Sequence, residues 1–488
     1  MRAPRTASQA SGGLEIAAAG LVMTLLAVIA VLLDRLTMDV VSGILTLLAL
    51  SVVGAVAVRW VARREGAPDL ASLLVMALFA KVVFTLVRYF VITVVYDDVA
   101  DAGNYVKWGV QFADLLRSGQ FPALDGSLTG RTPETERIGF VAGLMILVVG
   151  ASRYALSFLF SAICFAGQVL AWRAFRRAVP DGDSKRYAML LFFLPSMLFW
   201  PSSIGKDALM IGCIGVVSYG AAQLLGDQVS IGGVITFTVG VAALMAIRPH
   251  MALIAVVALA IGATAGSVSG IRQRGASKSA LVRLAALVAL VAIGSVGVTQ
   301  LGKFFQDENS GGDTGVRAAL EKTQEQTGTG GSEFQPIAAT SPVDLPAAVV
   351  TVLIRPFPWE VSNVTGLIAA AEGVVFVGLV VAGRRRLLGW ARALPRNPYL
   401  IYCAAYALVF IVLFSYVGNF GILARQRTQM MPLVLVCLSM RPAPRRPVEV
   451  RRVAARWGRN HKVDTGDVAL ARVGPGGHDL GGVGECQK

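Results

Sequence analysis

The chain has 488 residues, of which 55% are hydrophobic and only 15% are charged, and its mean hydropathy is +0.64. Soluble domains carry about 25% charged residues, so this composition excludes a soluble globular protein. The net charge of +15 would suggest nucleic-acid binding in a soluble protein. Here the basic residues lie in short loops between apolar runs, so we expect the partner to be a membrane and not a nucleic acid.

The first two apolar runs lie near 14–33 and 38–58, and each is about 20 residues long, the length that crosses ~30 Å of hydrocarbon. They predict an N-terminal transmembrane hairpin over 1–60 with cytoplasmic ends. The first run ends at Asp34 and Arg35 without a small-residue cleavage site, so we interpret it as a retained anchor and not as a signal peptide.

The third predicted span, 70–95, contains two cations, Lys81 and Arg88. They share one helical face at a depth where a cation is costly unless it is paired or faces water. Two roles are equally consistent with this position. One is structural pairing inside the protein, and the other is binding of an anionic lipid headgroup, for which Arg88 is the candidate.

Three carboxylates, Asp97, Asp98 and Asp101, stand at the beginning of the first long outer loop, and Tyr105 and Trp108 follow them. If the segment is helical, Asp97 and Asp101 share a face with Tyr105. One carboxylate can then act as a general base while its neighbours bind hydroxyl groups or a divalent metal such as Mg²⁺ or Mn²⁺. A solvated loop with a helix N-cap is the alternative interpretation.

The first outer loop, 96–153, contains an apolar segment, 138–150, that is too short to span the membrane. We expect this segment to be a re-entrant or interfacial helix. The next apolar segment, 154–172, must end on the cytoplasmic side because three arginines follow it.

Five further spans are predicted over 187–200, 205–225, 231–247, 250–268 and 280–299. The first outer turn among them contains prolines, which stop helices, and Lys206 and Asp207 open the helix that follows. A lysine at the positive end of a helix dipole favours a phosphate group, and a plain capped turn is the alternative. The next outer turn is Arg248-Pro249-His250. A single histidine cannot support a metal site, so we expect His250 to be a hydrogen-bonded turn residue near the substrate.

A second outer loop is predicted over 300–360. Its first part has the composition of a mobile loop, and it then contains a short apolar segment, 345–354, that we expect to be re-entrant or interfacial. Arg355, Trp359 and Glu360 follow where the chain re-enters the membrane. Interfacial anchoring is the ordinary role of such residues, and the alternative is that Arg355 binds a donor phosphate while Trp359 and Glu360 contact substrate.

The last three spans are predicted over 361–383, 398–417 and 428–440. The outer turn before the final span carries Arg425 and Arg427 without an acidic residue to neutralise them. Guanidinium groups left unpaired in this way are good ligands for phosphate or pyrophosphate. The basic tail over 441–488 has no apolar periodicity, and we expect it to be a disordered cytoplasmic segment.

The loops on one side of these spans hold most of the 45 basic residues of the chain, so that side and both termini are predicted to be cytoplasmic. The sequence thus predicts an all-α, polytopic transmembrane helix bundle of about 12 spans in a bacterial-type plasma membrane. Its unusual polar residues gather on the extracytoplasmic side. Its two halves show no pair of broken helices of the kind that marks inverted-repeat transporters.

This arrangement resembles the GT-C superfamily of membrane glycosyltransferases. The resemblance rests on three features, which are the acidic motif Asp97-Asp98 with Asp101, the short segments 138–150 and 345–354, and the outer cations Lys206, Arg355, Arg425 and Arg427. It implies a GT-C-like core over 70–440, a polyprenyl-linked sugar as donor, and a glycan or lipid as acceptor. It also implies that Asp97 or Asp98 deprotonates the acceptor hydroxyl and that Asp101 assists or contacts a metal.

The predicted function is transfer of a sugar from a polyprenyl-phosphate-type donor to a cell-envelope acceptor at the extracytoplasmic face. Lys206, Arg425 and Arg427 would hold the lipid phosphate. One alternative, which the chain also resembles, is an O-antigen-type polysaccharide polymerase or ligase that uses a lipid-pyrophosphate-linked glycan and depends on arginines and His250. A second alternative is a transporter of lipid-linked glycans without chemistry, which would need ionisable residues at the midplane of several spans.

Overall fold

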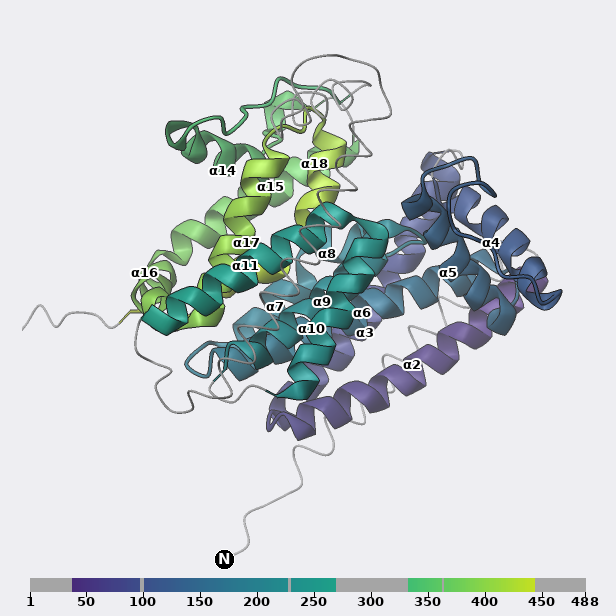
Figure 1. The fold of residues 1–488 in the computed structure, drawn as a ribbon, viewed down its shortest axis with the longest axis horizontal. Helices are drawn as coiled ribbons and strands as arrows, with labels where there is room; N and C mark the ends of the chain where they lie inside the picture. The colour runs from purple at the N-terminus through teal and green to yellow at the C-terminus, as the bar shows by residue number, and fades with distance from the viewer. Residues whose placement is uncertain (1–36, 97–100, 227–229, 269–331, 362–363, 444–488) are drawn as a thin grey trace, which may run out of the picture. The chain divides into compact units, whose positions relative to one another are not determined.

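The computed structural model describes residues 37–96, 101–226, 230–268, 332–361 and 364–443, all within the unit Met1–Ala443 (Figure 1). Several predicted features lie outside the described residues, namely the span near 14–33, Asp97 and Asp98, the span 280–299, most of the outer segment 300–344, and the tail beyond 443.

The secondary structure of the described ranges consists of helices, without strands. In chain order the helices are α2 (Met38–Arg64), η1 (Pro68–Leu70), α3 (Ala71–Phe90), η2 (Val91–Val95), α4 (Asp101–Arg117), α5 (Pro133–Val149), α6 (Arg153–Ala178), α7 (Ser184–Phe193), α8 (Pro195–Phe199), α9 (Lys206–Leu224), α10 (Ile231–Ile247), α11 (Pro249–Val268), η3 (Pro342–Asp344), α14 (Leu345–Leu353), η4 (Pro358–Glu360), α15 (Val364–Ala382), α16 (Arg384–Ala393), η5 (Leu394–Arg396), α17 (Pro398–Phe414), α18 (Phe420–Gln426), η6 (Arg427–Gln429) and α19 (Met431–Leu438).

Four helical segments in the described part of the chain are long and apolar enough to cross a membrane, and these are Met38–Arg64, Pro68–Val95, Arg153–Ala178 and Lys206–Leu224. A fifth is formed by Gly366–Ala382 and Arg384–Arg396 if this pair, bent by 68°, counts as one span. The helices α10, α11 and α17 are apolar but shorter. The predicted all-helical architecture is confirmed for these residues, which is compatible with a membrane protein, and the twelve-span topology stays a prediction.

Side-chain caps explain where several of these helices begin. Ser152, Asp183 and Ser230 each accept a hydrogen bond from a backbone N–H in the first turn of α6, α7 and α10, respectively. Asn397 and Asn419 do the same for α17 and α18. Such residues satisfy N–H groups that have no partner inside the helix, so the chain fixes these helix starts locally.

The segment 187–200 differs from its predicted continuous span, because α7 ends at Phe193 and the separate short helix α8 follows it. Pro195 and Pro201 have no N–H, so the carbonyls of Leu191 and Met197, four residues before them, lose their helical donors. Side chains from two other helices replace these donors, as the next paragraph describes.

Gln168 of α6 donates from Nε2 to the Leu191 carbonyl at 3.2 Å, and Lys81 of α3 donates from Nζ to the Met197 carbonyl at 3.1 Å. Both donor side chains are almost completely buried. Of the two roles considered for Lys81, structural pairing is therefore the one that this contact describes. The Lys81 amine also interacts with the Cys164 thiol.

A second broken helix, α18–η6–α19, lies beside α7. Tyr187 Oη donates to the Pro432 carbonyl at 2.6 Å, and the N–H of Asp183 donates to the Ser439 carbonyl at 2.7 Å. A long-range contact thus brings together two breaks that are far apart in the chain, while the expectation that the two halves hold no inverted-repeat pair stays a prediction.

Close helix packing in the centre depends on small residues. Helix α9 packs against α6 and α10 (Figure 1). A Cβ placed on Gly215 of α9 would lie 2.0 Å from the carbonyl oxygen of Gly167 in α6, and a Cβ on Gly167 would lie 2.4 Å from the carbonyl oxygen of Ile211. Glycine lets two backbones approach this closely in a membrane protein.

Charged contacts gather at two opposite ends of the long helices. At one end, Arg173 Nε contacts Glu65 Oε1 at 2.6 Å, and Arg386 Nη1 contacts Asp183 Oδ2 at 3.0 Å. We call this the Glu65 end. The opposite end, where α9 begins, contains Asp207, and we call it the Asp207 end.

The hairpin of α4 and α5 lies at the Asp207 end. The predicted short segment 138–150 belongs to the longer helix α5, whose glycines at 139 and 143 pack against α4. Glu136 of α5 is fully buried and accepts hydrogen bonds from the backbone N–H groups of Gly126 and, at 3.1 Å, Leu128. This carboxylate thereby fixes the loop that joins the two helices.

Candidate anion-binding site

Asp207 in the first turn of α9 is the centre of a group of charged side chains. Its side chain is only 6% exposed, and its Oδ2 accepts a hydrogen bond from Nε of Arg425 in α18. Its Oδ1 lies 3.8 Å from Nη2 of Arg248, the residue between α10 and α11. Gly205 precedes α9 and has a φ of 155°, a backbone conformation that favours glycine. This conformation sets the direction in which the chain enters the helix and thereby the position of Asp207.

Four cations from four parts of the chain form a group in which three act directly on this buried carboxylate. They are Arg88 of α3, Lys206 of α9, Arg248 and Arg425, and we call them the cation cluster. Arg425 interacts electrostatically with each of the other three. Asp207 interacts with Arg88, Arg248 and Arg425.

The surroundings shift the pKa values of the two arginines closest to Asp207 in opposite directions. The Asp207 carboxylate raises the pKa of Arg425, although burial opposes this shift. Burial lowers the pKa of Arg248, with Asp207 opposing and Arg425 adding to the shift. Asp207 pairs most closely with Arg425, and Asp101 and Glu134 act on Lys206. Four cations therefore face three carboxylates, and the remaining positive charge favours an anion.

Arg88 is the cation of the cluster with buried donors that have no hydrogen-bond partner in the described part of the chain. Its guanidinium carbon lies 4.7 Å from the ring centre of Phe199 and 5.0 Å from that of Trp200, and its side chain forms a hydrogen bond with Tyr96. The residue is 8% exposed, yet Nε and Nη1 have no hydrogen-bond partner among the described residues. Buried polar atoms are rarely left this way, so these two donors are available to a ligand.

An aromatic and acidic group borders the cluster on α4. Tyr105 is almost completely buried, and burial together with the Asp101 carboxylate raises the pKa of its phenol to about 12. The phenol also interacts with Arg425 and Asp207, and its ring makes an edge contact with Trp108 at 5.8 Å. Asp101 is exposed and interacts with Lys206 and Arg425, so one predicted acid stands beside the cations.

Three contributors to the site were not among the residues that the sequence pointed to. Arg248 Nη1 donates to Gln426 Oε1, and Lys206 Nζ donates to Thr135 Oγ1 at 2.9 Å. The sequence did contain a signal for Arg248, since this residue directly precedes Pro249 in a predicted outer turn. Thr135 and Gln426 carry no such signal, because only the folded chain brings α5 and α18 to α9.

His250 lies at the edge of the cluster. Its ring centre lies 6.0 Å from that of Phe414, and the imidazole interacts electrostatically with Arg248 and Lys206. The predicted position near the other outer residues is therefore observed, and its hydrogen-bonded role in the turn stays a prediction.

The other predicted phosphate ligands belong to a different set of contacts. Arg427 is 1% exposed, and its guanidinium donates to the carbonyls of Leu353 at 3.4 Å, Arg355 at 3.0 Å and Ala369 at 3.3 Å. These contacts tie η6 to α14 and α15. They give Arg427 a role in holding three helices together.

Arg355 pairs with Glu360, with Nη2 and Oε1 2.6 Å apart, and its guanidinium carbon lies 4.5 Å from the ring centre of Phe334. Trp359 stacks on Phe357 and is 79% exposed. The exposed ring fits the interfacial anchoring expected for this segment.

Metal binding is not supported by the described part of the chain, where no three His, Cys, Asp or Glu side chains come close enough to hold an ion. Asp97 and Asp98 lie outside that part. No protein-family model, curated protein or solved structure matches the chain.

Proposed function

We propose that the chain is a membrane glycosyltransferase whose cation cluster holds the phosphate of a polyprenyl-linked sugar donor. The observation that carries the proposal is the convergence of Arg88, Arg248 and Arg425 on a single buried carboxylate, with Lys206 beside two of these arginines. Arginines bind phosphate oxygens through charge-assisted, often bidentate hydrogen bonds. The site lies at the ends of helices that are long and apolar enough to span a membrane, which favours an amphiphilic ligand with an anionic headgroup.

The chemistry of the proposed reaction assigns different tasks to the acids and the cations. An aspartate accepts the proton of the acceptor hydroxyl, and Asp101 is the candidate in the described chain, with Asp97 and Asp98 as the others. The acceptor oxygen forms a bond to the anomeric carbon as the bond from that carbon to the phosphate oxygen breaks. The phosphate leaves with the electron pair, and the cation cluster stabilises its negative charge.

The proposed topology has about 12 spans and both termini in the cytoplasm. The Glu65 end would then be cytoplasmic and the Asp207 end extracytoplasmic in a bacterial-type plasma membrane. Supporting this orientation, Arg173 and Arg386 lie at the Glu65 end, together with the basic helix α16.

A polysaccharide polymerase or ligase would use the same cations for a lipid pyrophosphate. The two enzymes differ in which residues are essential, namely the acids in the transferase and the arginines in the polymerase. Transfer from a synthetic polyprenyl-linked sugar should fall by a factor of about 10² or more in Asp101→Asn if this residue is the base, while donor binding changes little. Arg425→Ala should weaken donor binding, because its bond to phosphate exists already in the ground state.

The chain offers matched controls for both changes on helix α4. Asp114→Asn and Arg117→Ala alter an exposed pair and should leave rate and binding unchanged. Full activity in Asp101→Asn, Asp97→Asn and Asp98→Asn, together with inactive arginine variants, would replace the transferase with the polymerase. Failure of the wild-type protein to turn over any lipid-linked sugar would remove both enzymes.

A transporter of lipid-linked glycans is the second candidate, and the adjacent broken helices α7–α8 and α18–η6–α19 favour it. Discontinuous helices line substrate sites in many transporters, and Arg425 lies in the second of these two breaks. Movement of a fluorescent lipid-linked sugar across vesicles that contain the protein, without any transfer product, would support this candidate.

A further inference from the structure

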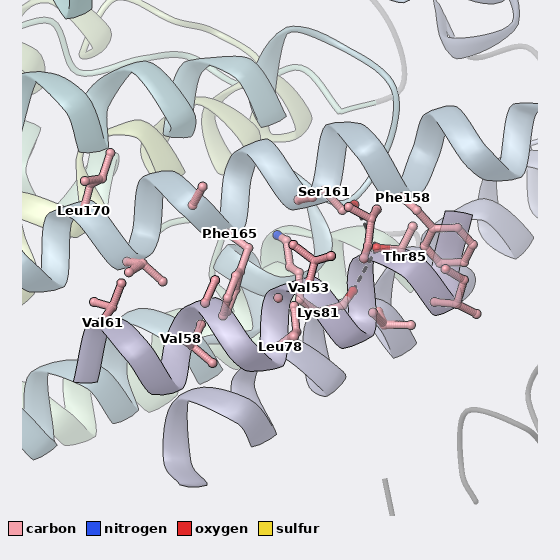
Figure 2. A pocket seen from close by; sticks show the side chains of 18 of the residues that line it. Val53, Val58, Val61, Leu78, Lys81, Thr85, Phe158, Ser161, Phe165 and Leu170 are labelled. Atoms are coloured by element: carbon pink, nitrogen blue, oxygen red, sulfur yellow. Dashed lines mark hydrogen bonds between the residues drawn. The ribbon is translucent and has the colours of Figure 1, made fainter. Parts of the chain in front are cut away.

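A groove of about 370 Å³ opens between α2, α3 and α6 (Figure 2). Its walls are apolar and include Val53, Leu78 and Phe165. All three helices belong to the candidate spans, and Val53 is 64% exposed. The groove is therefore an apolar depression on a surface that faces hydrocarbon when the helices span a membrane.

Small side chains create this depression. Ala57 of α2 and Ala166 of α6 line it and are both exposed. Their methyl groups are too short to fill the space between the two helices. Since an apolar space that is open to the membrane loses contact energy if nothing fills it, a hydrocarbon chain is the natural occupant.

The polar groups at the far end of the groove are already used by the protein. Thr85 Oγ1 lies 2.8 Å from both Ser161 Oγ and the Lys81 carbonyl, as the dashed lines in Figure 2 show. Lys81 contributes its stem to the groove, while its Nζ donates to the Met197 carbonyl. Among the described residues that line this end, Lys81 is the one cation, and its amine is used in this way.

The opposite end of the groove lies at the Glu65 end of the helices, where positive charge is in excess. Arg173 lines the groove there and pairs with Glu65. Arg64, three residues after the lining residue Val61 and on the same face of α2, is exposed, and its guanidinium lies 5.1 Å from the ring centre of Trp60. Exposed tryptophan and arginine together are typical of the boundary between membrane and water.

We propose that the groove binds one acyl chain of an anionic phospholipid whose headgroup contacts Arg64, which continues the groove face of α2. The lining residues of α2 run from Leu47 to Val61, a length of about 21 Å at 1.5 Å per residue. The groove is thus longer than the thickness of a single leaflet, which is ~15 Å, or half of the hydrocarbon core. The site is separate from the cation cluster, so its test does not depend on the proposed enzyme activity.

The experiment uses the full-length protein in nanodiscs that contain a trace of photoreactive phospholipid with a diazirine on its acyl chain. Phosphatidylglycerol and phosphatidylcholine probes with identical chains are compared, and labelled peptides are identified by mass spectrometry. The wild-type protein should be labelled on α2 and α6, more strongly with phosphatidylglycerol. Equal labelling by both probes would overturn the headgroup assignment without any substitution being needed.

Substitutions separate the chain contact from the headgroup contact. Ala57→Leu with Ala166→Leu fills the groove and should reduce labelling by both probes several-fold, whereas Ala49→Leu, at an exposed alanine of α2 outside the groove, should not. Arg64→Gln should reduce phosphatidylglycerol labelling alone, by about fivefold, whereas Arg63→Gln, at an exposed position on the opposite face of α2, should not. Undiminished labelling of the filled variant would overturn the proposal.

Discussion

At the scale of single residues, Gln168 and Lys81 repair the backbone of a neighbouring broken helix. Changing Gln168 to Leu keeps a side chain of similar size but leaves the buried Leu191 carbonyl without its donor. A buried acceptor without a partner costs about 1–3 kcal/mol, so the variant should unfold at a clearly lower temperature in detergent. Gln111→Leu, at an exposed position of α4, is the control, and equal stability of the two variants would show that the bond contributes nothing.

Tyr105 gives a prediction for alkaline pH. Burial and Asp101 raise the pKa of this phenol to about 12, whereas a tyrosine in the unfolded chain has a pKa of about 10. The unfolded chain therefore loses the proton first as pH rises. The contribution of Tyr105 to stability is complete below about pH 10 and is lost as pH rises through about 12.

The variant Tyr105→Phe cannot ionise at this position, so its stability should fall less steeply over this pH range than that of the wild-type protein. Unfolding in detergent followed as a function of pH measures the difference. Parallel curves for the two proteins would mean that the phenol of Tyr105 titrates like that of an exposed tyrosine.

The sequence indicated some of these residues and not others, for physical reasons. Arg88 could be selected because a cation inside a span is costly without a partner, and Lys206 and Asp207 because they open a helix whose positive dipole end favours a phosphate group. The carbonyl contacts of Arg427 could not be foreseen, because Leu353 and Ala369 reach it only through the packing of α14 and α15. Arg427 and Arg425 look alike in sequence, and their different neighbours are a property of the folded chain.

At the scale of elements, the contact between α6 and α9 depends on the absence of side chains. Gly215→Ala would place a methyl group 2.0 Å from the Gly167 carbonyl oxygen, so the helices must separate. Overpacking of this kind costs about 1–3 kcal/mol. The matched control is Gly378→Ala in α15, where nothing lies within 4 Å of the added carbon.

Thermal unfolding in detergent should therefore give a lower midpoint for Gly215→Ala and an unchanged or slightly higher one for Gly378→Ala, since alanine favours helix more than glycine does. A matching loss in both variants would point to a general effect of glycine replacement. Unchanged stability in both would mean that α6 and α9 are not in close contact.

The element boundaries show where reasoning from hydropathy succeeds. Long apolar runs identified α2, α3, α6 and α9, because each run reaches the length of a span. The same reasoning merged α7 and α8 into one span, since the apolar pattern continues across Pro195. The break is sustained by side chains of α3 and α6, which a local pattern does not contain.

At the scale of the whole molecule, the proposed orientation can be tested directly. Gln120 and Asp181 are both exposed, the first in the loop between α4 and α5 and the second between α6 and α7. In a background without native cysteines, a cysteine at 120 should react with a membrane-impermeant maleimide in intact cells. A cysteine at 181 should react only after permeabilisation, because the positive-inside rule places it in the cytoplasm. The reverse pattern would invert the topology and move the cation cluster to the cytoplasmic side.

The repair of the α7–α8 break also has a consequence for biosynthesis. In hydrocarbon, a carbonyl without a donor costs several kcal/mol because no water can replace the missing bond. Both replacement donors, Lys81 and Gln168, precede Pro195 in the chain, so a ribosome delivers them to the membrane before the segment that needs them. Chain order thus lets the broken helix enter next to partners that are already inserted.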